Sequence, residues 1–353
     1  MRSLADIAVR LKCKVHRCNS TVELSLNTQS KMKERYVSNI KIVLMQEVVG
    51  MTDQELIRKL ERPAGPVDVV IDTDTFNEID DQYALAYLIK SGEKLRLKAI
   101  YAAPFHNEKS KGPGDGMEKS YQEIMNVLDL MGREDLKENV CKGAVKYLPD
   151  ESQPVESAAA DDLIKRAMEH KEEEPLYIIA IGAITNIASA IIMEPEIINR
   201  VVVVWLGGNS YDWHDNREFN LYQDVAAARV VFDSGVPLVQ LPCMGVVSHF
   251  VTTGPELTYW LSGKNKLCDY LVNVTTSEAD RYEESACWSR AIWDVAAVAW
   301  LLDESFMLDR YEHSPVPEYD DRYAFDRTRH LIKYVYAINR DRLLEDLFHK
   351  LTR

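Results

Sequence analysis

Five acidic residues lie within ten positions, directly after a run of β-branched residues. Carboxylates this close together repel one another unless protons or a cation compensate their charge. A hard divalent cation such as Ca²⁺ or Mg²⁺ takes several oxygen ligands and would supply that compensation. The last two acids also open a predicted helix, whose dipole stabilises negative charge, so capping alone accounts for that pair taken by itself. The cluster as a whole favours a metal site; its members are Asp72, Asp74, Glu78, Asp80 and Asp81.

The elements that must position these acids follow from the apolar pattern. Residues 67–71 read as a buried parallel strand, and apolar residues at helical spacing then continue to Gly92. Further strands are predicted at 97–101, 177–181, 201–206 and 237–241, with helices at about 186–193 and 224–234. Alternating strands and helices predict an α/β fold, a mostly parallel open sheet with helices on both faces.

Polar residues cluster where the predicted strands end. Ligands of open α/β sheets bind outside the carboxyl ends of the strands, so these positions are the candidates for chemistry. Besides the acidic cluster, they comprise His106, Asn107, Asn209, Glu218 and Asn220.

The Asp72-Thr73-Asp74 segment resembles the start of the haloacid-dehalogenase-type phosphatases, which use Mg²⁺. That resemblance makes Asp72 the nucleophile and Asp74 the acid. The chain has Phe76 where that motif has Thr or Val, and the later Ser or Thr, Lys and acidic pair do not occur in the required order. A Mg²⁺-dependent phosphatase is therefore the alternative hypothesis.

Residues 67–302 as a whole resemble the inosine–uridine-type nucleoside hydrolases. These are Ca²⁺-dependent enzymes with a Rossmann-like fold that cleave the N-glycosidic bond of ribonucleosides to free base and ribose. Each matching segment is short, but their order and spacing together are specific. The segments are 70–74 with 79–81, 181–188, 206–209 with 218–220 and 224–228, and 293–298. The resemblance implies a nucleoside substrate, a role in purine or pyrimidine salvage, and a homodimer or homotetramer.

The same resemblance implies roles for individual residues. Asp74, Asp81 and Asp294 would bind Ca²⁺ through carboxylates, and Thr185 through its backbone carbonyl. Asp74 would also act as the general base that activates a water. The predicted substrate-binding residues are Asp72, Asp80, Asn107, Asn209, Glu218, Asn220 and Trp293.

The sequence departs from the family pattern at two places. Five residues separate Asp74 from Asp80 instead of the usual three, so we expect Asn77 or Glu78 to enter the pocket. Trp293 stands where many members have the His that protonates the leaving base. A tryptophan can stack on a base but is no acid at neutral pH, and an ordinary core role is an equal alternative.

The missing acid leaves two questions open. His249 and His106 are the candidate replacements, although a lone histidine is more often structural. Without a replacement, a nucleoside-binding protein that has lost turnover is a further alternative. The glycine-rich stretch 112–116 is expected to be a flexible loop, either a lid or a surface turn.

Composition excludes several classes of protein. The 353 residues carry a formal charge of −14, which repels nucleic acid. No apolar run approaches the roughly 18–20 residues of a membrane span, so a transmembrane protein is excluded. The six cysteines show neither CxxC spacing nor the density of a disulfide scaffold. A cytoplasmic protein with reduced thiols is the expectation.

Residues 1–50 differ from the rest, with nine basic and four acidic residues. They fit a basic extension, a presequence or, as we favour, a segment upstream of a translation start at Met51. In that case Thr52 or Asp53 caps a short helix. We predict an extension at 1–66 and one undivided domain at 67–353.

Overall fold

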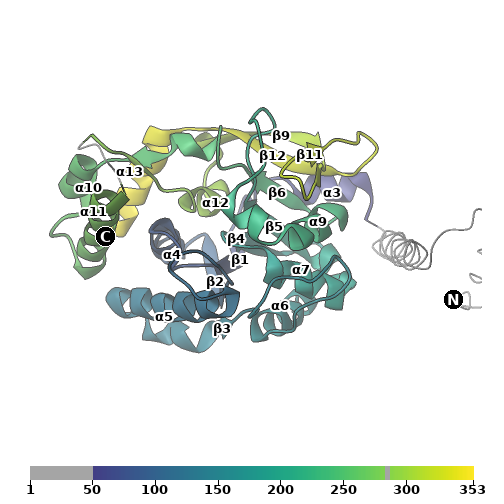
Figure 1. The fold of residues 1–353 in the computed structure, drawn as a ribbon, viewed down its shortest axis with the longest axis horizontal. Coiled ribbons are helices and arrows are strands. Elements are labelled where there is room, and N and C mark those ends of the chain that lie inside the picture. The colour runs from purple at the N-terminus through teal and green to yellow at the C-terminus, as the bar shows by residue number, and fades with distance from the viewer. Residues whose placement is uncertain (1–50, 283–286) are drawn as a thin grey trace, which may run out of the picture. The chain divides into compact units, whose positions relative to one another are not determined.

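The computed structural model describes residues 51–282 and 287–353, so the predictions for residues 1–50 lie outside it. Its core is an eight-stranded sheet in which all neighbours pair in parallel except the last two strands (Figure 1). The prediction of a mostly parallel open α/β sheet is confirmed. The strand order is β3 (Val140–Lys142), β2 (Leu95–Ala102), β1 (Val67–Thr73), β4 (Leu176–Ala180), β5 (Val201–Leu206), β6 (Leu238–Leu241), β12 (Leu331–Ile338) and β9 (Met307–His313).

Both faces of the sheet are buried. Successive side chains of a strand point to opposite faces, so a strand covered on both sides must be apolar throughout. In β1, Val69 and Ile71 join one apolar cluster while Val70 joins the other, and all three side chains are fully buried. This explains why the strands could be recognised as continuous β-branched runs.

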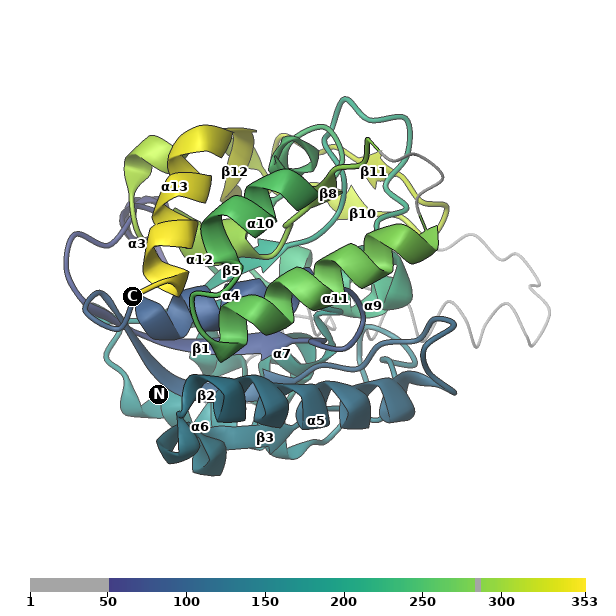
Figure 2. The same ribbon diagram turned by 90° about the vertical axis from the view of Figure 1, so that its left-hand side faces the viewer.

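Helices on each side supply the two clusters, which confirms the predicted double cover. In Figure 2, α11 runs beside α5, with α10 and α13 above it. One face carries α4 (Asp80–Lys90), α5 (Pro113–Met131), α10 (Gly254–Leu261), α11 (Lys266–Tyr282), α12 (Val295–Trp300) and α13 (Arg340–Leu351). The other carries α6 (Ala158–Glu169), α7 (Thr185–Met193) and α9 (Val225–Asp233).

Shorter elements complete the described chain. The 3₁₀ turns are Glu134–Asn139, Pro195–Arg200, Val247–His249 and Glu304–Phe306, and α8 is Phe219–Gln223. Two small antiparallel pairs join β7 (Val251–Thr252) to β8 (Arg290–Ala291) and β10 (Val316–Pro317) to β11 (Tyr323–Ala324).

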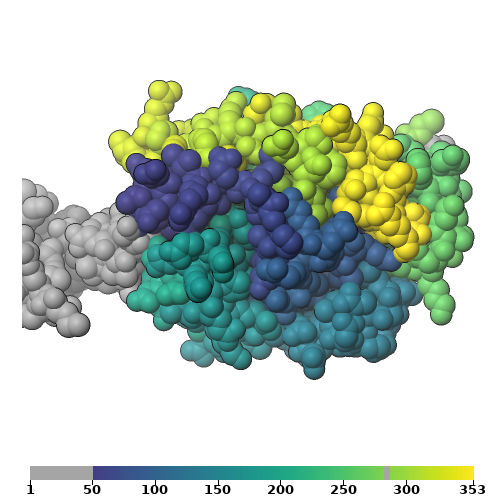
Figure 3. Space-filling view, turned by 180° about the vertical axis from the view of Figure 1, so that it is seen from behind, coloured from purple at the N-terminus to yellow at the C-terminus, as the bar shows by residue number. Residues whose placement is uncertain are grey.

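The helix predicted after Met51 is present as α3 (Asp53–Lys59). The Thr52 side chain caps it by accepting a hydrogen bond from the backbone N–H of Glu55. The Glu55 side chain accepts in turn from the backbone N–H of Thr52, which completes a capping box. Leu56 and Leu60 are buried, and α3 lies against β12 (Figure 3). The residues from Met51 therefore pack against the domain predicted at 67–353.

The prediction of a flexible loop at 112–116 is wrong, because this stretch begins α5. Pro113 occupies the first helical position, where its missing N–H is not needed and its fixed φ suits the helix. A Cβ at Gly116 would lie 2.0 Å from the carbonyl oxygen of Phe105. The glycine therefore permits close packing of α5 against the chain that follows β2, and the stretch is neither lid nor surface turn.

Candidate active site

A cavity of about 210 Å³ lies at the carboxyl ends of the central strands. It receives the end of β1, the first turn of α4, the loop after β5 and the start of α12. The residue types expected at the strand ends therefore meet in one place, as the rule for open α/β sheets predicts. The predicted site residues that line the cavity are Asp74, Asp80, Asp81, Asn209, Glu218, Asn220, Trp293 and Asp294.

Three carboxylates form a compact group in this cavity. One oxygen from each of Asp80, Asp81 and Asp294 lies within 4.8 Å of the others, and all three residues are buried. Asp80 and Asp81 open α4, and Asp294 precedes α12. The group can therefore hold a metal ion, and it includes Asp80, which the resemblance assigned to the sugar.

Asp74 adds a fourth buried carboxylate to the cavity. Its Oδ2 is buried and has no hydrogen-bond partner in the structure. A Cβ at Gly182 would lie 3.2 Å from Cγ of Asp74, so glycine leaves room for this side chain at the end of β4. An unpartnered carboxylate oxygen among three further carboxylates is the donor set that a hard divalent cation prefers.

Burial and mutual repulsion make these carboxyls reluctant to ionise. Burial, followed by the charges of neighbouring carboxylates, raises the pKa of Asp74, Asp80 and Asp294 well above the ordinary value. Burial raises the pKa of Asp81 to about 7, although the Thr73 hydroxyl donates a hydrogen bond that opposes the shift. None of the ion pairs among the described residues involves these four carboxylates. A bound cation would favour their ionised forms.

Three predicted residues do not line the cavity. Asp72 is fully buried and accepts a hydrogen bond from Nδ2 of Asn186 at 2.7 Å. The Thr185 hydroxyl donates to Oδ2 of Asp224 at 2.7 Å. Asn107 donates through Nδ2 to Oδ1 of Asn77, also at 2.7 Å. In this structure their side chains therefore support neighbouring segments.

Three backbone donors hold the side chain of Glu218 firmly in the lining of the cavity. Its carboxylate accepts hydrogen bonds from the backbone N–H groups of Gly208, Asn220 and Leu221 at 2.8–3.0 Å and caps α8. Asn220 donates through Nδ2 to the carbonyl of Leu206 at 3.0 Å. These bonds hold polar groups of the cavity lining in fixed positions, as sugar binding requires.

Trp293 and the two candidate histidines differ in whether they line the cavity. Trp293 lines the cavity and also packs against the apolar core, so both of its predicted roles are compatible with its position. His249 lies with Nδ1 3.0 Å from the carbonyl of Val246, and His106 is exposed with Nδ1 3.3 Å from Oγ of Ser110. Neither histidine lines the cavity, so neither takes the place of the missing acid here.

Asn77 and Glu78 do line the cavity, as the longer loop led us to expect. Glu78 forms an ion pair with Arg290 at 3.5 Å. Sequence reasoning missed Arg217 and Cys243, which also line the cavity. Arg217 directly precedes Glu218 in the loop after β5. Its position next to a predicted substrate-binding residue was the signal that could have indicated it.

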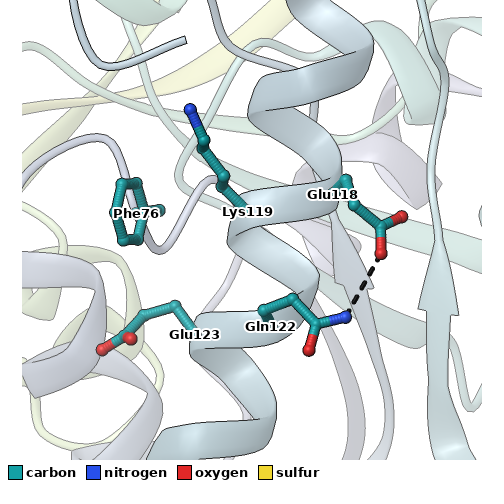
Figure 4. A pocket seen from close by; sticks show the side chains of 5 residues that line it. All are labelled: Phe76, Glu118, Lys119, Gln122 and Glu123. Carbon is teal, nitrogen blue, oxygen red and sulfur yellow. Dashed lines mark hydrogen bonds between the residues drawn. The ribbon is translucent and has the colours of Figure 1, made fainter.

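A second, separate hollow of about 180 Å³ lies on α5. Phe76, from the loop between β1 and α4, lies on the side of Lys119 and Glu123 of that helix, whereas Gln122 points toward Glu118 (Figure 4). None of the predicted site residues lines this hollow. It shows how the longer loop is arranged, with Phe76 beside α5 and the next residue, Asn77, in the main cavity.

Comparison with known proteins agrees with this geometry. The sequence model of the family described as inosine-uridine preferring nucleoside hydrolase matches residues 69–345.

Residues 51–282 and 287–353 contain no helix with the length and apolar character needed to cross a membrane.

Two curated relatives share moderate identity with the chain. It is 29% identical over 195 residues to the pyrimidine-specific ribonucleoside hydrolase RihA of Salmonella paratyphi A, which covers 48% of this chain and 58% of that protein. It is 27% identical over 250 residues to RihA of Citrobacter koseri, which covers 63% and 76% respectively. The chain therefore spans little more than half the length of the first of these relatives.

Solved structures share the fold. The purine-preferring ribonucleoside hydrolase from Gardnerella vaginalis matches with a TM-score of 0.68 and 20% identity, covering 81% of this chain and 98% of that one. A plant nucleoside hydrolase, PpNRh1, matches with a TM-score of 0.66 and 20% identity, covering 81% and 99%.

Proposed function

Because this chain belongs to the inosine-uridine preferring nucleoside hydrolase family, we propose that it hydrolyses the N-glycosidic bond of ribonucleosides to free base and ribose. The observation that carries the proposal is the cavity that Asp80, Asp81 and Asp294 line together with Glu218 and Asn220. A metal-binding group and firmly held polar side chains in one cavity suit a small polyhydroxylated substrate.

We assign the metal as Ca²⁺, held by Asp74, Asp81 and Asp294, with Asp80 beside them and the Thr185 carbonyl as a further ligand. Buried oxygen donors and the unpartnered Oδ2 of Asp74 support this assignment. When bound, the ion would orient sugar hydroxyls and lower the pKa of a water molecule. Its charge would also keep the surrounding carboxylates ionised at neutral pH.

Asp74 is the proposed general base. Its carboxylate lines the cavity, and its Oδ2 has no partner to displace. Burial raises its pKa, which makes the ionised carboxylate a stronger acceptor for a proton from water. Asp74 would take that proton as the water attacks the anomeric carbon.

The carboxylates also suit the electronic demand of the reaction. Breaking an N-glycosidic bond leaves positive charge on the anomeric carbon and the ring oxygen of the sugar. Fixed negative groups stabilise that charge without reorganising, and Glu218 is held in place by three backbone donors. These carboxylates would therefore bind the transition state more tightly than the substrate.

Trp293 gives the departing base an aromatic surface rather than a proton. It lines the cavity beside Asp294, whereas neither His106 nor His249 does. Contact with an indole favours planar bases. We therefore propose that the base leaves while stacked on Trp293, which suits substrates whose bases are good leaving groups.

Two alternatives remain to be compared with this proposal. A phosphatase needs Asp72 as an accessible nucleophile, but Asp72 is fully buried and does not line the cavity. Its position outside the lining of the cavity argues against phosphoryl transfer. A nucleoside-binding protein without turnover would use the same cavity. Only an assay of product release distinguishes it from a hydrolase.

The test is an assay of free base and free ribose on a panel of purine and pyrimidine ribonucleosides, with Ca²⁺ present. We expect release with the wild-type chain and none with Asp81→Ala. Asp161→Ala, an exposed aspartate in α6, is the matched control and should retain release. Saturable nucleoside binding without any release would support the binding protein. The predicted homodimer or homotetramer and cytoplasmic location remain separate proposals.

A further inference from the structure

We propose that Asn77 donates a hydrogen bond to a hydroxyl of the sugar, and that Asn107 is a positioning residue which orients the Asn77 amide. The inference rests on the proposed function in one respect, namely that a pentose occupies this cavity. It moves the sugar-binding role expected of Asn107 to Asn77, because Asn77 lines the cavity and Asn107 does not.

The loop between β1 and α4 brings Asn77 into the cavity. Phe76 is 39% exposed and lines the hollow on α5, whereas Asn77 is only 7% exposed. The side chains of Phe76 and Asn77 thus line two different hollows, although the two residues are adjacent in the sequence. The five residues between Asp74 and Asp80 give the loop enough length to do this.

Hydrogen bonds hold the backbone of Asn77 in place. Its N–H donates to the carbonyl of Asp74 at 2.7 Å. Its carbonyl accepts from Nζ of Lys109 at 2.7 Å, and the same Nζ lies 2.6 Å from Oε1 of Glu278 in α11. The first bond closes a turn within the loop, and Lys109 joins the loop to α11, which gives the side chain a defined position.

A backbone donor fixes which way both amides face. The backbone N–H of Lys109 donates at 2.9 Å to Asn107, so the atom that accepts must be the Asn107 oxygen. The Asn107 nitrogen then points to Asn77 at 2.7 Å and, being a donor, must meet the Asn77 oxygen. The Asn77 Nδ2 has no partner among the described residues.

That free donor complements the rest of the cavity. Ionised carboxylates only accept hydrogen bonds, and the Nδ2 groups of Asn209 and Asn220 donate to backbone carbonyls of Asp215 and Leu206. A sugar hydroxyl is both donor and acceptor. It can donate to a carboxylate such as Asp80 while its oxygen accepts from Asn77, so both groups are satisfied by one hydroxyl.

The test measures sugar binding by calorimetry, without turnover. D-Ribose and its 2-, 3- and 5-deoxy forms are titrated into the wild-type chain and Asn77→Ala, with Ca²⁺ present. A lost neutral hydrogen bond should weaken ribose binding by about 3- to 10-fold. For one deoxy sugar, which lacks the contacted hydroxyl, Asn77→Ala should cause no further loss.

Asn107→Asp tests the orienting role. The backbone N–H of Lys109 still holds one oxygen, so the second carboxylate oxygen replaces the donor and faces the Asn77 oxygen. Repulsion then turns the Asn77 amide and removes its donor from the cavity. We expect the same 3- to 10-fold loss as for Asn77→Ala, and no additional loss in the double variant. Asn126→Ala, on α5 outside the cavity, should bind like the wild type.

Three results would overturn the inference: unchanged ribose affinity in Asn77→Ala, an equal loss for all four sugars, or no ribose binding to the wild-type chain. The ribose-release assay separates this inference from the proposed function. Selective loss for one hydroxyl without release of base would leave Asn77 a sugar ligand and refute hydrolysis. Release of base without that selectivity would refute the role of Asn77 alone.

Discussion

The backbone N–H of Asp294 donates a hydrogen bond to Oδ2 of Asp80 at 3.2 Å, across 214 positions of sequence. This bond joins the start of α12 to the first turn of α4. It brings together two carboxylates that are both buried and mutually repelling. The fold thus stabilises an arrangement that is electrostatically unfavourable without a cation, which is the main structural argument for a metal centre.

Ca²⁺ should stabilise the folded chain. At a concentration 100 times its dissociation constant, a ligand that binds only the folded state adds about 2.7 kcal/mol to the free energy of unfolding. Thermal unfolding should therefore shift upward with Ca²⁺ and downward with chelator, and Asp81→Ala should abolish most of the difference. An identical melting temperature with and without Ca²⁺ would refute the metal site.

The metal-free chain should become less stable as pH rises from about 4 to 7. The folded-state pKa of Asp81 is about 7 because the side chain is buried, whereas the ordinary pKa of this side chain is 3.8. Between these values the unfolded chain has lost a proton that the folded chain keeps, so raising the pH favours unfolding. Denaturant titrations in chelator at several pH values measure this slope. Asp81→Asn should reduce it, and Ca²⁺ should suppress it.

Trp293→His should increase base release from substrates with poor leaving groups. An imidazole beside Asp294 can donate the proton that an indole cannot, and general acid catalysis typically contributes at least about 100-fold. The rate of the variant should fall as pH rises through the histidine pKa. Steady-state rates against pH for wild type and variant measure this; rates equal to the wild type at every pH would show that protonation of the base does not limit turnover.

Gly116→Ala should destabilise the domain by about 1–3 kcal/mol, in the range for overpacked cores. The new methyl group would lie 2.0 Å from the carbonyl of Phe105, and the clash is with backbone. Gly65→Ala is the matched control, since a Cβ there meets nothing within 4 Å. Chemical denaturation of both variants decides; equal stabilities would mean that α5 does not pack this closely.

Leu60→Ala should destabilise the chain by about 2–5 kcal/mol, because Leu60 is fully buried in the main core. Ile57→Ala, at a position in α3 that is 37% exposed, should have a much smaller effect. The same unfolding experiment compares the two. A negligible effect at Leu60 would favour a domain that begins at residue 67.

Periodicity predicted the inner strands because both of their faces are covered. The run at β5 is apolar at every position, and all six residues are buried. The last two strands were not predicted. β9 is an edge strand with exposed Leu308, and β12 contains Lys333, which is buried beside Asp309 at 3.5 Å. A local pattern cannot indicate that a distant carboxylate will accompany a buried lysine.

The lining of the cavity was predictable where residue type and strand end coincide, as for Asp74 after β1 and Asn209 after β5. It was not predictable where the position of a loop decides which side chains reach the cavity. Arg217 lines the cavity from a loop whose Asn216 N–H is bonded to the carbonyl of Asp321, a residue more than 100 positions later. The orientation proposed for the amides of Asn77 and Asn107 likewise depends on a backbone donor at Lys109. Contacts of this kind are set by the tertiary fold.

The decisive measurement of hydrolysis is to incubate the chain with ribonucleosides and Ca²⁺ in ¹⁸O-labelled water and to analyse the products by mass spectrometry. Hydrolysis should give free base and free ribose in equal amounts, with the label in ribose. Release should stop with chelator, resume with Ca²⁺ and be absent in Asp81→Ala. Absence of labelled ribose from every purine and pyrimidine ribonucleoside, in a chain that still binds Ca²⁺, would contradict hydrolysis.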